Sequence, residues 1–282
     1  MAKSQKVSLI AVSRPRFWLY VLGPYALGVI AAVPDVRRLL DLEILVWGLF
    51  FLFPANLLIY GINDVFDYET DRRNAKKEGY EALVRPETHR VLLMWIAATC
   101  LPFLPRLPAA GGPATLALLG FLFFSVEYSA PPIRAKARPF LDAAFNVLYV
   151  FPAIFGYYLA GGDALQWQAV AAGWCWCFAM HAFSAVPDIS ADREAGLATV
   201  ATVLGARGTE ALCAVLYLAA GLLAMRYVGP LAPALAVGYA LVMAWSYAGA
   251  TEKAAFSVYR FFPLGNILSG MLLTLTLLAQ RV

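Results

Sequence analysis

Two short segments of the chain carry oxygen-bearing side chains at helical spacing. The first contains Asn63, Asp67 and Asp71, and the second contains Asp188 and Asp192. Residues four positions apart lie on one face of a helix, so each set projects its oxygens in one direction. Two carboxylates about 4 Å apart repel each other by roughly 4 kcal/mol at an effective dielectric near 20. The spacing therefore predicts that cations lie among these side chains.

Magnesium is the cation that fits these ligands. Mg²⁺ prefers hard oxygen ligands, keeps several waters and shares its remaining positions with substrate phosphates. Zinc prefers cysteine or histidine, and the histidines of this chain are His89 and His181. We interpret Asn63 and the four aspartates as a magnesium site that also accommodates a diphosphate, because the metal ions would offset the combined negative charge.

A basic stretch at Arg134–Arg138 is a candidate for binding that diphosphate. Arginine suits bidentate contact with phosphate oxygens, and lysine suits a point contact. Arg134 and Lys136, together with Arg72 after the first cluster, are therefore candidate diphosphate ligands. Basic residues in such a loop are also expected from membrane topology alone, so both explanations stay open. The sequence has no glycine-rich phosphate loop of the Walker kind.

The composition is that of a membrane protein. Of the 282 residues, 61% are hydrophobic and 14% are charged, whereas soluble domains carry about 25% charged residues. The mean hydropathy of +0.68 agrees. At about 20 residues per span, this length has room for roughly eight to ten spans and little else. We therefore expect a single membrane domain over residues 1–282.

The apolar runs predict an all-α membrane protein of nine transmembrane helices in a bundle. The predicted spans are 17–33, 44–62, 91–107, 112–127, 141–161, 166–187, 211–227, 230–249 and 261–279.

Charge sidedness predicts the orientation. Most of the 22 Lys and Arg residues fall on one side of the nine spans, which places the N-terminus in the cytoplasm by the positive-inside rule. The same rule explains the net charge of +4, so we expect a bilayer around the protein and no nucleic-acid partner. Both aspartate clusters share the cytoplasmic side. We expect an active site facing the cytoplasm, in the cell membrane of a prokaryote.

Several polar residues lie inside predicted spans, where such side chains are often functional. His181 precedes Asp188 by seven residues, about two turns deeper on the same helix face. His181, Asn146 and Asn56 are candidates for binding an acceptor substrate or for accepting a proton. A plain hydrogen bond to a neighbouring helix is an equally open role for each of them.

Other residues are expected to have simpler roles. Tyr60, Phe124 and Tyr149 are candidates for an aromatic lining, because aromatic faces attract cations. Asp64 and Glu69 face away from the aspartate set and are expected to be surface charges.

Two prolines predict helix breaks, since proline removes a backbone donor inside a helix. Pro187 lies immediately before Asp188 and is expected to free the carbonyl of Phe183. Pro54 is expected to do the same near Phe50, within the second span.

The motif Asn63-Asp64-x-x-Asp67-x-x-x-Asp71, paired with Asp188-x-x-x-Asp192, resembles the UbiA superfamily of intramembrane prenyltransferases. The resemblance implies nine helices around a lateral cavity, an isoprenyl diphosphate donor and Mg²⁺ dependence. It assigns the metal and diphosphate roles to Asn63 and the four aspartates. The family's inner-loop Tyr and Lys map onto Tyr128 and Lys136, although Pro131-Pro132 separates them more widely here than in many relatives.

Within the superfamily, four stretches look like the lycopene elongase branch of carotenoid prenyltransferases. They are Ser13–Trp18, Phe53–Asn56, Tyr128–Pro132 and Ala185–Asp188. The resemblance implies an apolar lipid or polyene acceptor such as lycopene. The predicted spans offer no Lys or Arg at mid-depth for an acidic acceptor, which agrees, although a quinone precursor stays open.

Two other classes of membrane protein fit the sequence less well. A divalent-cation transporter would place its acids near the middle of the bilayer, whereas these lie at one edge. A CDP-alcohol phosphotransferase would carry an Asp-Gly…Ala-Arg…Gly pattern, and the sequence does not contain it.

Overall fold

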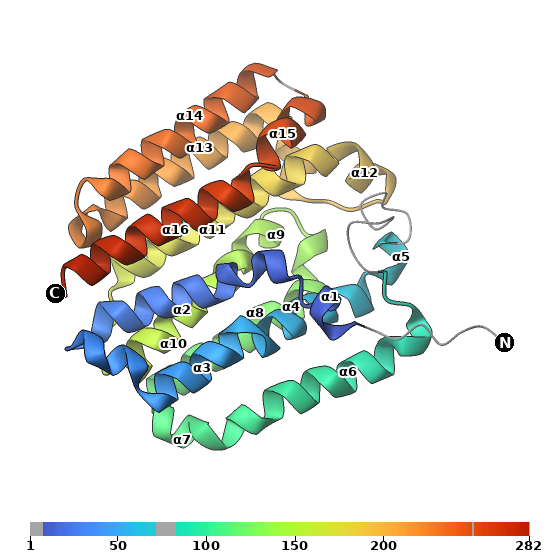
Figure 1. Ribbon diagram of the computed structural model, residues 1–282. Coiled ribbons are helices and arrows are strands. Elements are labelled where there is room, and N and C mark those ends of the chain that lie inside the picture. The colour runs from blue at the N-terminus through green and yellow to red at the C-terminus, as the bar shows by residue number, and fades with distance from the viewer. Residues whose placement is uncertain (1–7, 72–82, 250, 282) are drawn as a thin grey trace.

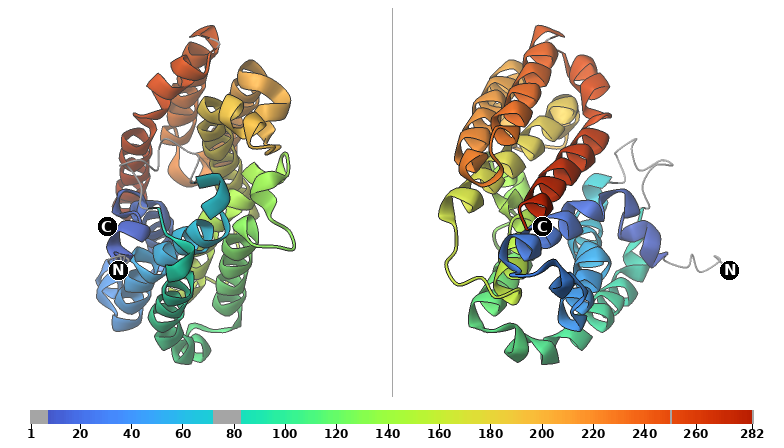
Figure 2. Two further views of the ribbon diagram at one scale, coloured as in Figure 1. Left: turned by 90° about the vertical axis from the view of Figure 1, so that its right-hand side faces the viewer. Right: turned by 60° about the vertical axis from the view of Figure 1, so that its left-hand side comes forward.

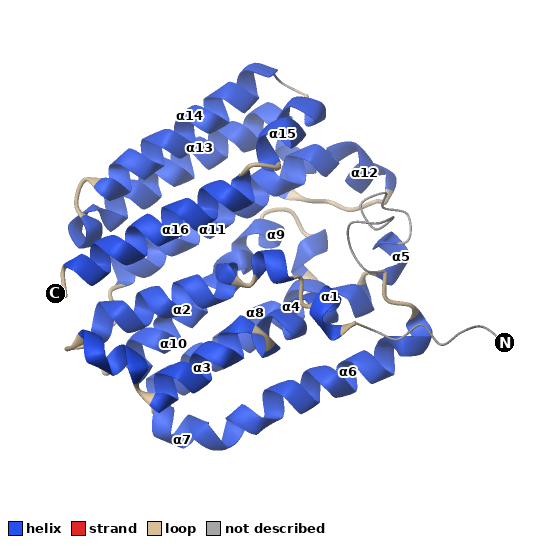
Figure 3. Cartoon of the chain, viewed as in Figure 1, coloured by secondary structure: helices blue, strands red, loops and turns tan. Residues whose placement is uncertain are grey.

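The structure is a computed structural model that describes residues 8–71, 83–249 and 251–281, and the described part of the chain is helical without strands (Figure 3). The side chains of Thr70 and Asp71 also lie outside the description. The α-helices are α1 Leu9–Val12, α2 Leu19–Ala32, α3 Leu42–Leu52, α4 Pro54–Phe66, α5 Tyr68–Asp71, α6 Pro86–Cys100, α7 Leu107–Ala110, α8 Gly112–Ser129, α9 Leu141–Ala144, α10 Phe151–Leu159, α11 Trp167–Ala185, α12 Ile189–Glu194, α13 Val200–Val228, α14 Leu231–Gly249, α15 Glu252–Tyr259 and α16 Phe262–Ala279. Short 3₁₀ helices cover Pro15–Phe17, Val36–Leu40, Leu101–Arg106, Ala135–Ala137, Phe145–Tyr149 and Val186–Asp188.

The expectation of an all-helical membrane protein is confirmed. Seven helical stretches of the described chain are long and apolar enough to cross a membrane: Leu42–Phe66, Pro86–Ala110, Gly112–Ser129, Trp167–Glu194, Val200–Val228, Leu231–Gly249 and Phe262–Ala279. The other two predicted spans are helical but shorter. The span predicted at 17–33 contains the 14-residue α2. The span predicted at 141–161 is divided into α9, the 3₁₀ helix and α10.

The helix break predicted at Pro54 is present, since α3 ends at Leu52 and α4 begins at Pro54. Asn56 is fully buried, and its Nδ2 donates to the carbonyls of Phe51 at 3.0 Å and Leu52 at 2.9 Å. Backbone carbonyls released by a break inside a membrane need such partners. Asn56 therefore donates hydrogen bonds to the backbone carbonyls at the break between α3 and α4.

The break predicted at Pro187 is also present, but its detail differs from the expectation. The carbonyl of Phe183 is not freed, because it accepts from the backbone N–H of Val186 at the end of α11. The chain continues as a 3₁₀ turn through Val186–Asp188 and then as α12. A tighter turn of this kind commonly satisfies the last carbonyls of a helix.

The helices pack into two main cores. The first is formed mainly by α2, α3, α4, α8 and α10, with Trp47 and Phe155 fully buried. The second is formed mainly by α11, α13, α14, α15 and α16, with Phe183 and Tyr217 fully buried. Figure 1 shows the second group of helices above the first. Helix α16 (red) lies beside α2 (blue) in Figure 1 and Figure 2, so these two helices join the groups.

The contact between α2 and α10 in the first core depends on two glycines. A Cβ at Gly28 of α2 would overlap the backbone of Ala153 in α10, and a Cβ at Gly156 would overlap the carbonyl of Tyr25. Small residues let helices approach closely inside a membrane, where packing drives association. These two positions therefore fix α2 against α10.

Both aspartate-bearing segments lie at one end of the bundle. Figure 1 shows α5 and α12 at the same end as α1, opposite the C-terminal end of α16. The end that carries α5 and α12 is therefore where a site shared by the two clusters would have to form.

Candidate functional site

The described part of the first cluster is a compact polar contact. The Asn63 Nδ2 donates to Asp67 and, at 3.0 Å, to the Oγ of Ser129 at the end of α8. The carboxylate of Asp67 forms an ion pair with Lys136 from the following loop. Asp67 is 2% exposed, and a buried carboxylate requires such partners. Residues of α4, α8 and the loop thus meet on one buried charge.

The backbone explains why Asp67 points where it does. Helix α4 ends at Phe66, and the N–H of Asp67 donates to the carbonyl of Asn63 at 2.9 Å. The same helical turn brings the two side chains together, as the spacing predicts. However, the helix does not run on to Asp71, because the chain breaks at Asp67 before the short α5.

Asp67 and Asp188 share an unusual backbone conformation. Asp67 has φ −106° and ψ 3°, and Asp188 has φ −106° and ψ 5°. This sparsely populated bridge region is common among active-site residues. Each residue lies where a long helix gives way to a short one, so both clusters are built on a helix break.

The second cluster lies on α12. Asp188 is the residue before the helix, and Asp192 lies in its first turn, where its Oδ2 accepts from the Thr199 hydroxyl at 3.5 Å. Tyr128 lies close enough to both Asp67 and Asp192 to interact electrostatically with their carboxylates. Tyr128 therefore links the two clusters in space.

A cavity of about 230 Å³ extends from this region between the two cores. Its lining consists of Arg14, Phe17, Tyr20, Ile59, Tyr60, Asn63, Tyr128, Asn146, Leu148, Tyr149, Met180, His181, Ser184, Tyr259, Phe262 and Asn266. Tyr60 and Tyr149 share a hydrogen bond of 3.4 Å between their hydroxyls. Polar groups lie among aromatic rings throughout, which suits an apolar ligand with one charged end.

Several predicted residues line this cavity and others lie elsewhere. Asn63, Tyr128, Asn146, His181, Tyr60 and Tyr149 line it. Asn56 does not, because it is used at the break between α3 and α4. Arg134 is exposed, with φ 46°, and Phe124 packs against the first core. Arg72 and the Asp71 side chain lie outside the described residues.

The expectation that Asp64 is a surface charge is wrong. Asp64 is 3% exposed, and its Oδ1 accepts from Arg14 Nη2 at 2.9 Å. The Arg14 guanidinium lies 4.7 Å from the centroid of the Tyr60 ring and lines the cavity. The signal was a carboxylate beside a long apolar run, which needs a cation partner when buried. Glu69, by contrast, is exposed as expected.

Sequence reasoning also missed Asp142. This residue is fully buried in α9, and its Oδ2 accepts from the backbone N–H of Val200 at 3.0 Å. The contact joins the start of α13 to α9. Like Asp67 and Asp192, Asp142 interacts electrostatically with Tyr128.

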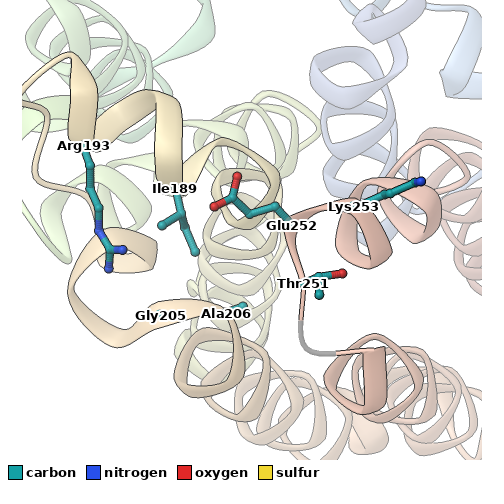
Figure 4. Close-up of a pocket in the computed structure, with 7 residues that line it drawn as sticks. All are labelled: Ile189, Arg193, Gly205, Ala206, Thr251, Glu252 and Lys253. Atoms are coloured by element: carbon teal, nitrogen blue, oxygen red, sulfur yellow. The ribbon is translucent and has the colours of Figure 1, made fainter.

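A second hollow, of about 480 Å³, lies beside α12. Figure 4 shows Arg193 and Lys253 at its two sides with Glu252 between them. The Glu252 Oε1 accepts from the N–H of Ser190 at 3.2 Å and from its hydroxyl at 2.6 Å. The candidate site residues lie outside this lining, so the hollow flanks the second cluster without belonging to it.

The donor chemistry fits Mg²⁺. Asn63 and Asp67 offer amide and carboxylate oxygens, which magnesium prefers, and the Lys136 ammonium shows that a cation is stable beside Asp67. Among the side chains that the structure describes, no three His, Cys, Asp or Glu residues are grouped around one point.

Comparison with known proteins identifies relatives along nearly the whole chain. The sequence is 40% identical to a lycopene elongase/hydratase of Haloferax volcanii, over 98% of this chain and 90% of the relative. It is 35% identical to a lycopene elongase/hydratase of Corynebacterium glutamicum, over 98% of each.

Solved structures of archaeal UbiA homologues share the fold. The homologue from Archaeoglobus fulgidus, bound to GPP and Mg²⁺, superposes with a TM-score of 0.68 at 21% identity, covering 93% of this chain and 98% of the other. The apo homologue from Aeropyrum pernix K1 gives a TM-score of 0.71 at 17% identity, covering 95% and 99%. Residues 21–266 match the UbiA prenyltransferase family. With that match and these relatives, the chain belongs to the UbiA prenyltransferase family and is an intramembrane prenyltransferase.

Proposed function

We propose that the protein transfers an isoprenyl group from an isoprenyl diphosphate to lycopene or a similar polyene, as a step of carotenoid biosynthesis. The observation that carries this proposal is the cavity, which joins the Asn63 end to a tyrosine-rich interior. Membership of a prenyltransferase family excludes the divalent-cation transporter. Relatives named lycopene elongase/hydratase favour the polyene acceptor.

The proposed diphosphate end of the site contains the two aspartate clusters. Asn63, Asp67, Asp71, Asp188 and Asp192 would hold magnesium, which when bound withdraws charge from a diphosphate leaving group. Lys136 would place its ammonium where that negative charge develops, and such preorganised charge lowers the barrier. Arg134 and Arg72 are proposed as further contacts to the diphosphate.

The proposed acceptor end is aromatic. Tyr60, Tyr128 and Tyr149 present rings to the cavity, and aromatic faces attract a developing carbocation. Arg14 is the charged residue among the described cavity-lining side chains, and Asp64 pairs with it. A lining of this kind favours an apolar acceptor over an acidic one, because it leaves little charge to bind a carboxylate.

We also propose a topology of nine spans with a cytoplasmic N-terminus. Helix α2 and the stretch Leu141–Leu159 would complete the seven longer helices. The support is that α1 and the end of α16 lie at opposite ends of the bundle, as an odd number of crossings requires (Figure 1). The aspartate end would then face the cytoplasm.

The function is tested by reconstituting the protein in lipid nanodiscs. Dimethylallyl and geranyl diphosphate would be supplied with lycopene or with a quinone precursor, in Mg²⁺ or in EDTA. Diphosphate release and the masses of the products would be measured. We expect an elongated polyene only with lycopene and Mg²⁺. Products from the quinone precursor alone would overturn the acceptor assignment.

The matched variants are Asp67→Asn and Asp163→Asn. We expect Asp67→Asn to lower turnover by roughly 10²-fold or more, since it removes a charge that faces the reaction. Asp163 is exposed in the loop between α10 and α11, so its variant should keep normal turnover. Near-normal rates in Asp67→Asn would contradict the site assignment.

A further inference from the structure

One chemical step of the proposed prenyl transfer has no residue assigned to it so far. Adding an allyl cation to a carbon–carbon double bond forms a C–C bond and leaves a cation on the acceptor. That cation is removed either by loss of a proton or by capture of water. Relatives of this chain are named lycopene elongase/hydratase, which pairs elongation with hydration in those proteins. The following inference rests on the proposed function.

The cavity contains a histidine–tyrosine pair at a suitable place. The Tyr128 hydroxyl and the His181 Nε2 are joined by a hydrogen bond of 3.2 Å between α8 and α11. Their rings meet edge to face, with centroids 5.7 Å apart. Both residues line the same cavity as Asn63 and the tyrosines. A proton acceptor is therefore present in the chamber where the acceptor cation would form.

The surroundings of His181 can also hold a water molecule. Tyr128, Asn146 and Ser184 are polar residues of the same lining. The Ser184 hydroxyl donates to the carbonyl of His181 at 2.7 Å, which leaves its oxygen able to accept. A buried water needs about two to four polar partners and roughly 30 Å³, and the cavity offers about 230 Å³.

His181 is better suited to this step than the carboxylates nearby. Asp67 is engaged by Lys136, and it and Asp192 belong to the proposed diphosphate end. Among the described side chains, His181 belongs to no group of three possible metal ligands. A neutral imidazole accepts a proton without bringing negative charge that would trap the carbocation earlier in the reaction.

We propose that His181 is the base that hydrates the elongated acceptor. In this proposal the proton of the neutral imidazole is on Nε2, which donates to the Tyr128 oxygen, and the lone pair is on Nδ1, since the hydrogen bond at one ring nitrogen sets the tautomer. The water oxygen bonds to the acceptor carbocation as one water proton moves to Nδ1. The product is a tertiary alcohol, and the imidazolium later returns its proton to solvent. Tyr128 is the positioning residue of this pair.

The test measures the ratio of hydrated to unhydrated elongated product, with lycopene as acceptor in H₂¹⁸O. In the unaltered protein we expect the alcohol to carry the ¹⁸O label. His181→Gln keeps a hydrogen-bonding side chain of similar reach but is not a base. We expect it to lower the hydrated-to-unhydrated ratio by roughly 10²-fold, as for loss of a general base. Tyr128→Phe should lower the same ratio less.

The control is His89→Gln. His89 lies in α6 and bonds to the carbonyl of Val84 at 3.1 Å, away from the cavity lining. We expect its product ratio to match that of the unaltered protein. Because the readout is a ratio, a partial loss of total turnover in a variant does not disturb it.

Three results would overturn the inference. They are an unchanged ratio in His181→Gln, an alcohol without ¹⁸O, and a His181→Gln protein that is present in the membrane but makes no elongated product. Absence of any elongated product from the unaltered protein would instead contradict the proposed function itself. The two failures are thus distinguishable.

Discussion

Asp64 and Asp67 lie within one helical turn and have different partners. Asp64 pairs with Arg14, which is 50 residues away along the chain, and Asp67 pairs with Lys136. The i, i+4 spacing predicted the contact between Asn63 and Asp67, because that contact is local. It could not predict Arg14, since nothing in the periodicity of either segment specifies the other.

The Arg14–Asp64 pair gives a test of buried charge. Asp64→Asn removes the carboxylate while keeping its shape, and breaking a buried pair costs roughly 3–5 kcal/mol. We expect a clear fall in the melting temperature of the detergent-solubilised protein. Adding Arg14→Gln should recover part of the loss, because the guanidinium is then no longer buried without its carboxylate.

A matched exposed pair serves as the control. Arg38 and Asp41 are also 2.9 Å apart, but their side chains are 55% and 44% exposed. Exposed pairs contribute only about 0–1 kcal/mol, so Asp41→Asn should leave the melting temperature nearly unchanged. Equal falls in melting temperature for Asp64→Asn and Asp41→Asn would show that burial does not determine how much the Arg14–Asp64 pair stabilises the protein.

At the scale of elements, helix breaks position the site. The sequence predicted where two of these breaks lie, but not the hydrogen bonding at one of them and not the kink in α13. Pro54 and Pro187 both mark breaks, because proline acts locally. The fate of the Phe183 carbonyl was mispredicted, since a 3₁₀ bond to Val186 satisfies it. The kink in α13 at Gly205, with φ 68°, was missed because the apolar run was expected to begin only at residue 211.

The short helix α12 is tethered by α15. Glu252 accepts two hydrogen bonds from Ser190, two residues before Asp192. Ser190→Ala removes the hydroxyl bond, and a hydrogen bond to a charged group contributes enough for roughly a tenfold effect. We expect the Mg²⁺ concentration for half-maximal turnover to rise by about that factor. Ser257 lies on the same α15 and its hydroxyl donates to the carbonyl of Lys253 at 3.0 Å, so Ser257→Ala should leave this Mg²⁺ concentration unchanged.

The contact between α2 and α10 gives a packing test. Gly28→Ala places a methyl group against the backbone of Ala153, and overpacking of this kind costs roughly 1–3 kcal/mol. We expect a lower melting temperature. In Gly23→Ala, on the same helix, the added carbon meets nothing within 4 Å, so stability should not fall. A neutral Gly28→Ala would show that the helices separate easily here.

At the scale of the whole molecule, hydropathy predicted the helical class but not the length of every crossing. Seven stretches meet the expectation directly. The stretch 141–161 was predicted as one span because its residues are apolar, yet α10 begins at Phe151, with Pro152 in its first turn, and a 3₁₀ helix covers Phe145–Tyr149 before it. Hydrophobic composition indicates that a segment lies in the bilayer. The backbone conformation of that segment also depends on the helices that pack against it.

The orientation can be tested with reporters fused to each end of the chain. Nine crossings with a cytoplasmic start predict a reporter active in the cytoplasm at the N-terminus and one active outside at the C-terminus. Cytoplasmic activity of both reporters would require an even number of crossings and would contradict the proposed topology.

The separation of the two main cores has a consequence for cooperativity. Each core closes around its own buried aromatic residues, and the cavity lies between them. The two halves therefore need not melt together, and the empty protein is expected to lose structure in two transitions. A ligand that contacts both walls of the cavity, from Tyr60 to Phe262, binds only while both halves are folded. Its binding energy is therefore lost when either half unfolds by itself. Saturation would merge the two transitions into one.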